Sequence, residues 1–174
     1  SLARDLLDRP FDEDGARASK GKVHAALLNE LSAEAFLHHD GPRATEYQKW
    51  GPDYLWRVRK MAEAAGCGGE DLLATAAELT ARSVAEAVGG LTERPHEVIL
   101  AGGGARNIDL AGRIRRHLSP SSTYTTDRYG FGLRAYSATC MAMLAAARLQ
   151  GFPAHCPAAS GARRAGVLGG VFAP

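Results

Sequence analysis

Three consecutive glycines, Gly102, Gly103 and Gly104, carry the clearest chemical signal in the sequence. They follow a short apolar segment at residues 98–101, which predicts a buried strand, and they precede residues 105–118, which predict a helix. Glycine lets the backbone turn sharply and approach a ligand closely. The first turn of a helix adds unpaired N–H groups and the positive end of the helix dipole, which together favour phosphate. On this stretch alone, a tight strand-to-helix turn that binds nothing is an equally good interpretation.

Two further groups of residues raise the question of a metal site. They are the acidic residues at positions 12–14 and the adjacent histidines His38 and His39. The acids lack the alternating oxygen ligands and the distal glutamate of a calcium loop. We therefore interpret Asp14 as the cap of the short helix that follows, and Gly21 as the end of that helix. Neighbouring histidines point in different directions on regular structure and no third ligand is close in sequence, so this pair does not favour a metal site.

Composition limits the classes of protein that fit. The chain has 174 residues, 45% hydrophobic and 23% charged, which predicts one soluble globular domain. The net charge of +2 is too small to predict nucleic acid or an anionic membrane surface as the main partner. The odd number of widely spaced cysteines favours a reducing compartment over a disulfide framework. The sequence shows neither a signal-peptide pattern nor a bilayer-spanning apolar run, so we expect a cytoplasmic location.

Helices make up most of the framework that must position these residues. Apolar spacing predicts helices at residues 23–31, 45–65 with a break at 50–51, 71–88 and 134–149, and strands at 98–101 and 123–126, with a further candidate strand at 167–172. Strand, helix, strand, helix is the order of parallel pairing through a right-handed crossover. Because so few strands form a poor core for this length, we expect further strands upstream or from another chain.

Two apolar segments raise the question of burial. The aromatic stripe of Tyr47, Trp50 and Tyr54 has helical spacing, and we assign it to packing rather than to a sugar-binding platform. The helix at residues 134–149 is apolar on almost all sides, which predicts that it is buried.

Several motifs occur in an order that is typical of one family. They are an aromatic-Asp-x-Asp-Gly segment at residues 11–23, an Asp-x-x-Ala-Thr helix at residues 71–85, the glycine segment at residues 99–107, Thr125-Thr126-Asp127 with Gly130, and tail segments at residues 151–153 and 160–162. With this set the chain resembles the C-terminal half of the anhydro-N-acetylmuramic acid kinases, which are related to sugar kinases, heat-shock chaperone ATPases and actin. The resemblance implies an α/β fold, a helix-rich partial actin-like (ribonuclease H-like) ATPase domain with a small, mostly parallel sheet. Residues 1–174 would be a single domain of a two-domain kinase.

The family's reaction opens a 1,6-anhydro ring with water while ATP, with Mg²⁺, phosphorylates O6. The residues that the resemblance implies for ATP binding are Gly102, Gly103, Gly104, Ala105 and Asn107, with Asp14 and Thr75 as further candidates. The residues implied for binding the amino sugar are Ser137, Arg43 and Thr45. The resemblance places no catalytic residue and no metal ligand in this chain. The missing N-terminal half is the implied partner, and a homodimer is left open.

The chain also departs from the family pattern. The phosphate-gripping Gly-Thr-Ser-x-Asp-Gly segment and the Asp-x-Gly-Pro segment are absent, and the catalytic aspartate with them. Tyr47 and Gln48 stand where the family has arginine and glutamate, and Ser137 stands where it has a sugar-contacting glutamate. Losing one such contact costs about 1–3 kcal/mol if its partner is left unpaired. Two hypotheses follow: a kinase portion that is inactive alone, or a non-catalytic kinase-like domain that acts in binding or dimerisation.

Overall fold

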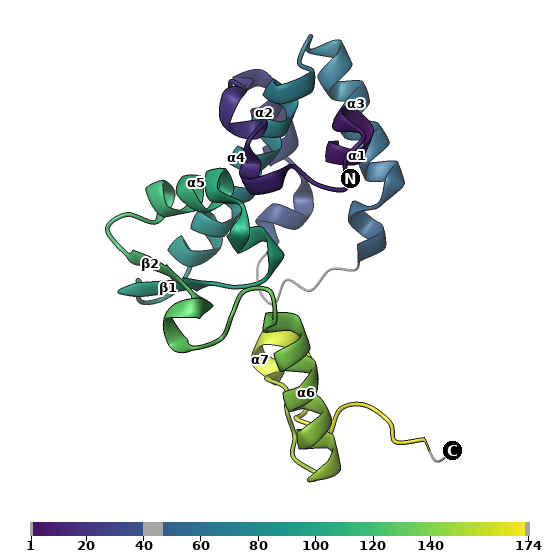
Figure 1. The fold of residues 1–174 in the computed structure, drawn as a ribbon, viewed down its shortest axis with the longest axis vertical. Helices are drawn as coiled ribbons and strands as arrows, with labels where there is room; N and C mark the ends of the chain where they lie inside the picture. The colour runs from purple at the N-terminus through teal and green to yellow at the C-terminus, as the bar shows by residue number, and fades with distance from the viewer. Residues whose placement is uncertain (1, 40–46, 173–174) are drawn as a thin grey trace.

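The computed structural model describes residues 2–39 and 47–172 and shows a helix-rich protein with one small sheet (Figure 1). The helices and strands are α1 (Leu2–Leu7), α2 (Ala25–Ser32), α3 (Pro52–Ala64), α4 (Gly69–Gly89), β1 (Glu97–Leu100), α5 (Ile108–Leu118), β2 (Ser122–Thr125), α6 (Tyr136–Leu149) and α7 (Pro157–Ser160). Short 3₁₀ turns lie between them: η1 (Glu13–Gly15), η2 (Ala18–Lys20), η3 (Ala35–His38), η4 (Tyr47–Trp50), η5 (Gly103–Arg106) and η6 (Thr126–Tyr129). The predicted α/β class with a small parallel sheet is confirmed.

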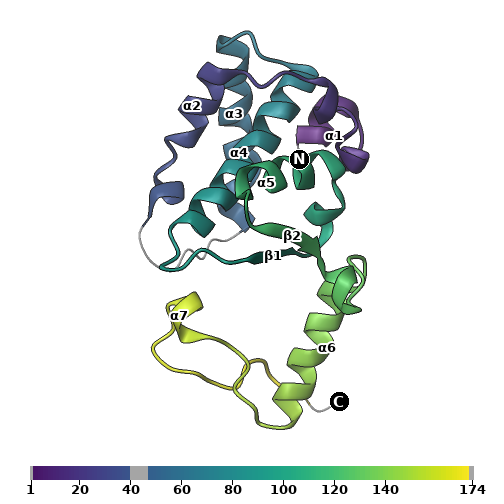
Figure 2. The ribbon, with the colours of Figure 1, turned by 90° about the vertical axis from the view of Figure 1, so that its left-hand side faces the viewer.

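The sheet consists of β1 and β2, which pair in parallel as predicted. Glu97 lies opposite Ser122 at one end of the register, and Leu100 lies opposite Thr125 at the other. The glycine turn and α5 form the connection between the two strands, and α5 lies over the sheet (Figure 2). Basic residues fill the last turn of α5, where they complement the negative end of the helix dipole.

Helix α4 is common to both hydrophobic clusters of the protein. Leu72, in its first half, packs in a cluster whose other buried members are Leu27, Leu31, Val58, Ala62 and Cys67. Ala81, in its second half, packs with Ile114 and Leu118 of α5. Each fully buried leucine stabilises the fold by about 1.5–3 kcal/mol relative to an exposed one. Helix α4 therefore joins the helical part to the unit formed by β1, α5 and β2.

The aromatic residues at the start of α3 pack against one another, as predicted for Trp50 and Tyr54. The Trp50 ring meets the rings of Phe36 and Tyr54 edge-on, with centroids 5.5 and 4.7 Å apart. Pro52 stands in the first turn of α3, where its missing N–H costs nothing. The predicted break between two helical pieces is thus confirmed at Gly51.

Three predictions about elements were wrong. The helix expected from residue 105 begins at Ile108, because the glycine segment forms the 3₁₀ turn η5 first. Residues 167–172 form no strand within the described chain, since no neighbouring strand is there to pair with them.

Helix α6 is the third and largest departure. It was expected to be buried, yet none of its described residues is, and Met141, Met143 and Leu149 are 66%, 62% and 76% exposed. Figures 1 and 2 both show α6 projecting beyond the sheet, away from the other long helices. Periodicity predicts an apolar surface but not what covers it. Here the described segment at residues 168–171 lies beside part of this surface, and much of the rest is exposed.

Candidate functional site

A pocket of about 410 Å³ lies between the turn η1 and the glycine turn η5. One wall is formed by Phe11, Asp12, Glu13 and Asp14, and the other by Gly103, Gly104, Arg106, Asn107 and Leu110. Segments far apart in the sequence therefore meet here. Of the residues predicted to bind the cofactor, the pocket brings together Asp14, Gly103, Gly104 and Asn107.

The glycine turn leaves the floor of this pocket open. Gly102 has φ +77°, in the left-handed region that favours glycine, and a Cβ on either Gly102 or Gly103 would meet no atom within 4 Å. Gly102 and Ala105 complete the turn without lining the pocket, and the Ala105 N–H donates to the Gly102 carbonyl over 3.3 Å. A ligand can therefore approach the backbone at Gly103 without meeting side chains, while Gly104 lies beside the Leu110 side chain.

Asn107 fixes the start of α5 at the edge of the pocket. Its side-chain oxygen accepts the Leu110 N–H over 2.8 Å, which satisfies one of the unpaired donors of the first helical turn. The sequence prediction placed Asn107 inside a helix. The structure places it at the N-cap, so the positive end of the α5 dipole lies at the edge of the pocket that Asn107 lines.

The opposite wall depends on two residues in the left-handed region. Asp14 has φ +54° and Gly15 has φ +74°. Aspartate tolerates this conformation better than most residues, and glycine adopts it without strain. Gly15 is pressed against α5: a Cβ there would lie 2.7 Å from Cβ of Asp109 and would also overlap Oδ1 of Asn107. The two walls are therefore in direct contact.

Asp12, not Asp14, caps the short turn that follows. Its two carboxylate oxygens accept the N–H groups of Arg17 and Ala18, each over 2.9 Å. The prediction that Asp14 is the cap was therefore wrong, because it is the Asp12 side chain that reaches forward to the N–H groups at the start of η2. Asp14 is instead exposed at the pocket.

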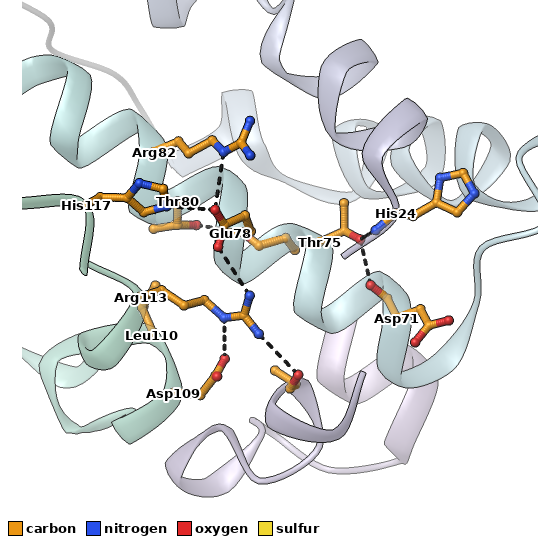
Figure 3. A network of polar contacts seen from close by, with 12 residues as sticks. His24, Asp71, Thr75, Glu78, Thr80, Arg82, Asp109, Leu110, Arg113 and His117 are labelled. Atoms are coloured by element: carbon orange, nitrogen blue, oxygen red, sulfur yellow. Dashed lines mark hydrogen bonds and ion pairs between the residues drawn. The ribbon is translucent and has the colours of Figure 1, made fainter. Parts of the chain in front are cut away.

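A network of charged side chains, buried at Glu78 and Arg113, joins α4 to α5 (Figure 3). Arg113 of α5 donates from Nε to Asp109 over 2.7 Å and from Nη1 to Glu78 over 3.2 Å. Glu78 also contacts His117 over 2.7 Å and Arg82 over 3.2 Å. Burial raises the pKa of Glu78, but hydrogen bonds from His117, Arg113 and Arg82 outweigh it and hold that pKa below its ordinary value. Sequence reasoning missed this network. The one signal for it was Glu78, an ionisable residue among the apolar residues of α4, which indicates a basic partner on a neighbouring element.

The family model of anhydro-N-acetylmuramic acid kinase matches residues 2–174. The chain belongs to this family. Proteins named anhydro-N-acetylmuramic acid kinase from Salinibacter ruber, Chromohalobacter salexigens and Streptomyces coelicolor are 33%, 36% and 35% identical to it over 178, 171 and 164 residues. These alignments cover 100%, 96% and 92% of this chain but 45%, 45% and 40% of the relatives. The chain thus spans less than half the length of these relatives.

Thr75, a further candidate for binding ATP in the sequence analysis, does not line the pocket. It is fully buried in α4, where its hydroxyl donates to the Asp71 carbonyl over 2.7 Å and accepts the His24 N–H over 2.9 Å. These bonds tie the start of α2 to α4, so Thr75 acts in this structure as a packing residue.

The residues expected to bind the sugar are not brought together by the described chain. Ser137 is exposed in the first turn of α6, which contributes nothing to the pocket lining. Arg43 and Thr45 lie outside the described residues. Within residues 2–39 and 47–172, no three His, Cys, Asp or Glu side chains are grouped to hold a metal ion. No helix of that part of the chain has the length and apolar character needed to cross a membrane.

The lining of the pocket combines apolar side chains, open backbone and carboxylates. Its volume of about 410 Å³ falls in the range of small-molecule sites, roughly 300–1,000 Å³. Phe11 and Leu110 offer apolar surface for a base, and the glycines offer backbone for polar groups. Glu13 and Asp14 are hard oxygen donors, and Mg²⁺ in nucleotide sites takes one or two carboxylates together with phosphate oxygens and water.

Proposed function

We propose that this chain supplies the nucleotide side of an ATP-dependent anhydro-N-acetylmuramic acid kinase. The carrying observation is the convergence of Asp14, Gly103, Gly104 and Asn107 on one pocket in a chain of this family. In the proposed reaction, water opens the 1,6-anhydro ring of the amino sugar and the γ-phosphoryl group of ATP passes to O6. Phosphoryl transfer depends on positioning and on charge stabilisation, and this pocket contributes the positioning of the nucleotide.

Each wall has a distinct part in the proposed binding. The backbone of the turn η5 lies against the nucleotide, and the N-terminus of α5 faces its polar end. Asp14, exposed on the other wall, accepts hydrogen bonds from ribose hydroxyls. Mg²⁺ would neutralise phosphate charge when bound, and Glu13 is the neighbouring carboxylate of the pocket lining that could hold it. ATP as co-substrate and three free cysteines support a cytoplasmic location.

Binding of ATP by this chain is the direct test. Gly103→Val places a branched side chain at a residue that lines the pocket, where a Cβ would meet no atom within 4 Å, so we expect it to obstruct the ligand with little strain on the fold. Gly68→Val is the matched control, because Gly68 also faces open space but does not line this pocket. In calorimetric titrations with ATP and Mg²⁺, we expect Gly103→Val to raise the Kd about tenfold or more, a loss of at least about 1.4 kcal/mol, and Gly68→Val to leave it unchanged. No binding by the parent chain, or equal binding by both variants, would contradict the proposal.

The chemistry itself is proposed to need the rest of the family's length. The segments that hold the phosphates and the catalytic aspartate have no counterpart in these residues. Incubation of this chain with ATP, Mg²⁺ and 1,6-anhydro-N-acetylmuramic acid is therefore expected to yield no phosphorylated sugar. Formation of the 6-phosphate by the purified chain would overturn this part of the proposal.

A non-catalytic role in binding or dimerisation is the second candidate. Two points favour it: the resemblance implies a sugar-contacting glutamate where this chain has Ser137, and α6 exposes apolar side chains. Sedimentation of the chain with and without ATP separates the candidates. A stable dimer that does not bind ATP supports the non-catalytic role, and a chain that binds ATP supports the kinase role.

A further inference from the structure

Arg113 is the most buried basic side chain of the described residues, and it donates hydrogen bonds to acceptors in three elements. It is 7% exposed, although arginine is rarely buried unless it is fully paired. Its guanidinium donates to Asp109 in the first turn of α5, to Glu78 of α4 and, over a longer distance of 3.5 Å, to the Ala18 carbonyl in η2. Figure 3 shows the guanidinium lying between Glu78 and Asp109.

Arg113 is hydrogen-bonded to residues next to both walls of the nucleotide pocket. On the α5 wall, Asp109 follows two residues after the Asn107 cap and belongs to the same helical turn. On the other wall, the Ala18 N–H donates to Asp12, which lines the pocket, while the Ala18 carbonyl accepts from Arg113. The guanidinium therefore connects the two walls through at most one intervening residue on each side.

We infer that Arg113 is a positioning residue for the nucleotide pocket, because it holds the wall containing Asp14 against the wall formed by the glycine turn and α5. This inference rests on the proposed binding of ATP in that pocket. The guanidinium carries five N–H donors in a fixed planar fork, so one side chain can serve three acceptors at once. A lysine ammonium at the same place keeps the charge but is a compact point that cannot span the same acceptors.

The alternative is that Arg113 only neutralises buried carboxylates and so stabilises the fold. Arg82 separates the two roles, since it also pairs with Glu78 but reaches neither Asp109 nor Ala18, and its side chain is 44% exposed. Leu27 provides a second comparison, because it is fully buried in the other cluster and lies outside the pocket. A loss of stability alone would be reproduced at Leu27, whereas a loss of positioning would not.

The test compares four proteins, all of this chain: the parent, Arg113→Lys, Arg82→Lys and Leu27→Ala. The Kd for ATP with Mg²⁺ is measured by titration, and backbone hydrogen exchange is followed at residues 13–20 without ligand. If the wall is correctly placed in only a tenth of Arg113→Lys molecules, the apparent Kd rises about tenfold. We expect that rise, with faster exchange at residues 13–20, in Arg113→Lys alone.

The outcomes separate this inference from the proposed function. Tight ATP binding by the parent with an unchanged Kd in Arg113→Lys overturns the positioning role and leaves the proposed function standing. An equal rise in Kd for Leu27→Ala also overturns it, since stability then explains the effect. If the parent binds no ATP, the proposed function fails, and hydrogen exchange decides whether Arg113 holds the wall: unchanged exchange in Arg113→Lys overturns that as well. Should Arg113→Lys fail to fold, Asp109→Asn, which removes one of the two charged acceptors of Arg113, takes its place with the same expected results.

Discussion

Replacing Gly15 by alanine tests the contact that joins the two walls of the pocket. Alanine must adopt the left-handed backbone of Gly15, at φ +74°, which costs about 1–2 kcal/mol. Its Cβ would also lie 2.7 Å from Cβ of Asp109, and crowding of this kind adds about 1–3 kcal/mol as the neighbours shift. The expected total is a loss of about 2–5 kcal/mol in the free energy of unfolding. That is a large part of the roughly 5–15 kcal/mol typical of a folded domain.

Gly66→Ala is the matched control for this prediction. Gly66 has a similar φ of +66°, but a Cβ there would meet no atom within 4 Å, so only the backbone cost of about 1–2 kcal/mol applies. Urea unfolding of both variants, followed by far-ultraviolet circular dichroism, measures the two losses on the same scale. Equal losses at Gly15 and Gly66 would refute the close packing of η1 on α5.

Three further predictions concern single side chains. Burial raises the pKa of Glu78, but its three basic partners lower that pKa by more, so the net shift is downward. The contribution of Glu78 to stability is therefore complete above the ordinary pKa that the carboxyl has in the unfolded chain. It is lost as pH falls through the lower folded-state pKa, so Glu78→Gln should flatten the acid limb of stability against pH. Asn107→Ala removes the cap of α5 and should cost about 1 kcal/mol in urea unfolding, while Asn107→Asp should retain the cap. Burial raises the pKa of the Cys67 thiol, so a thiol reagent at neutral pH should modify exposed Cys156 at once and Cys67 only after unfolding.

Local signals in the sequence were sufficient for the strand, glycine turn and parallel crossover. The apolar run before Gly102 and the β-rich segment at residues 123–126 were expected to pair in parallel, which the structure confirms with the second strand one residue earlier, at Ser122–Thr125. The start of α5 was misplaced by three residues, since alanine and arginine after the glycines suit a helix or a 3₁₀ turn equally. Asn107 carried the correct signal, because asparagine is a preferred N-cap.

Only part of the candidate site could be predicted from the sequence. The glycine turn and Asp14 were selected, but which of two nearby aspartates caps a turn depends on the path of the backbone between them. The pairing of Glu78 with Arg113 joins residues 35 positions apart on different helices, and no periodicity links them. The exposure of α6 is likewise set by what surrounds the helix rather than by its own residues.

The two-stranded sheet has a consequence for handling the protein. Within the described chain each strand has one neighbour, so β1 and β2 each present an outer row of backbone N–H and C=O groups. Ile99 on β1 is also 48% exposed. Such an edge is a template for strand addition, and it dictates the spacing and register of whatever chain joins it. In concentrated solutions of this chain alone, that template is available to other copies, so dilute samples are the right condition for measuring its ligand affinity.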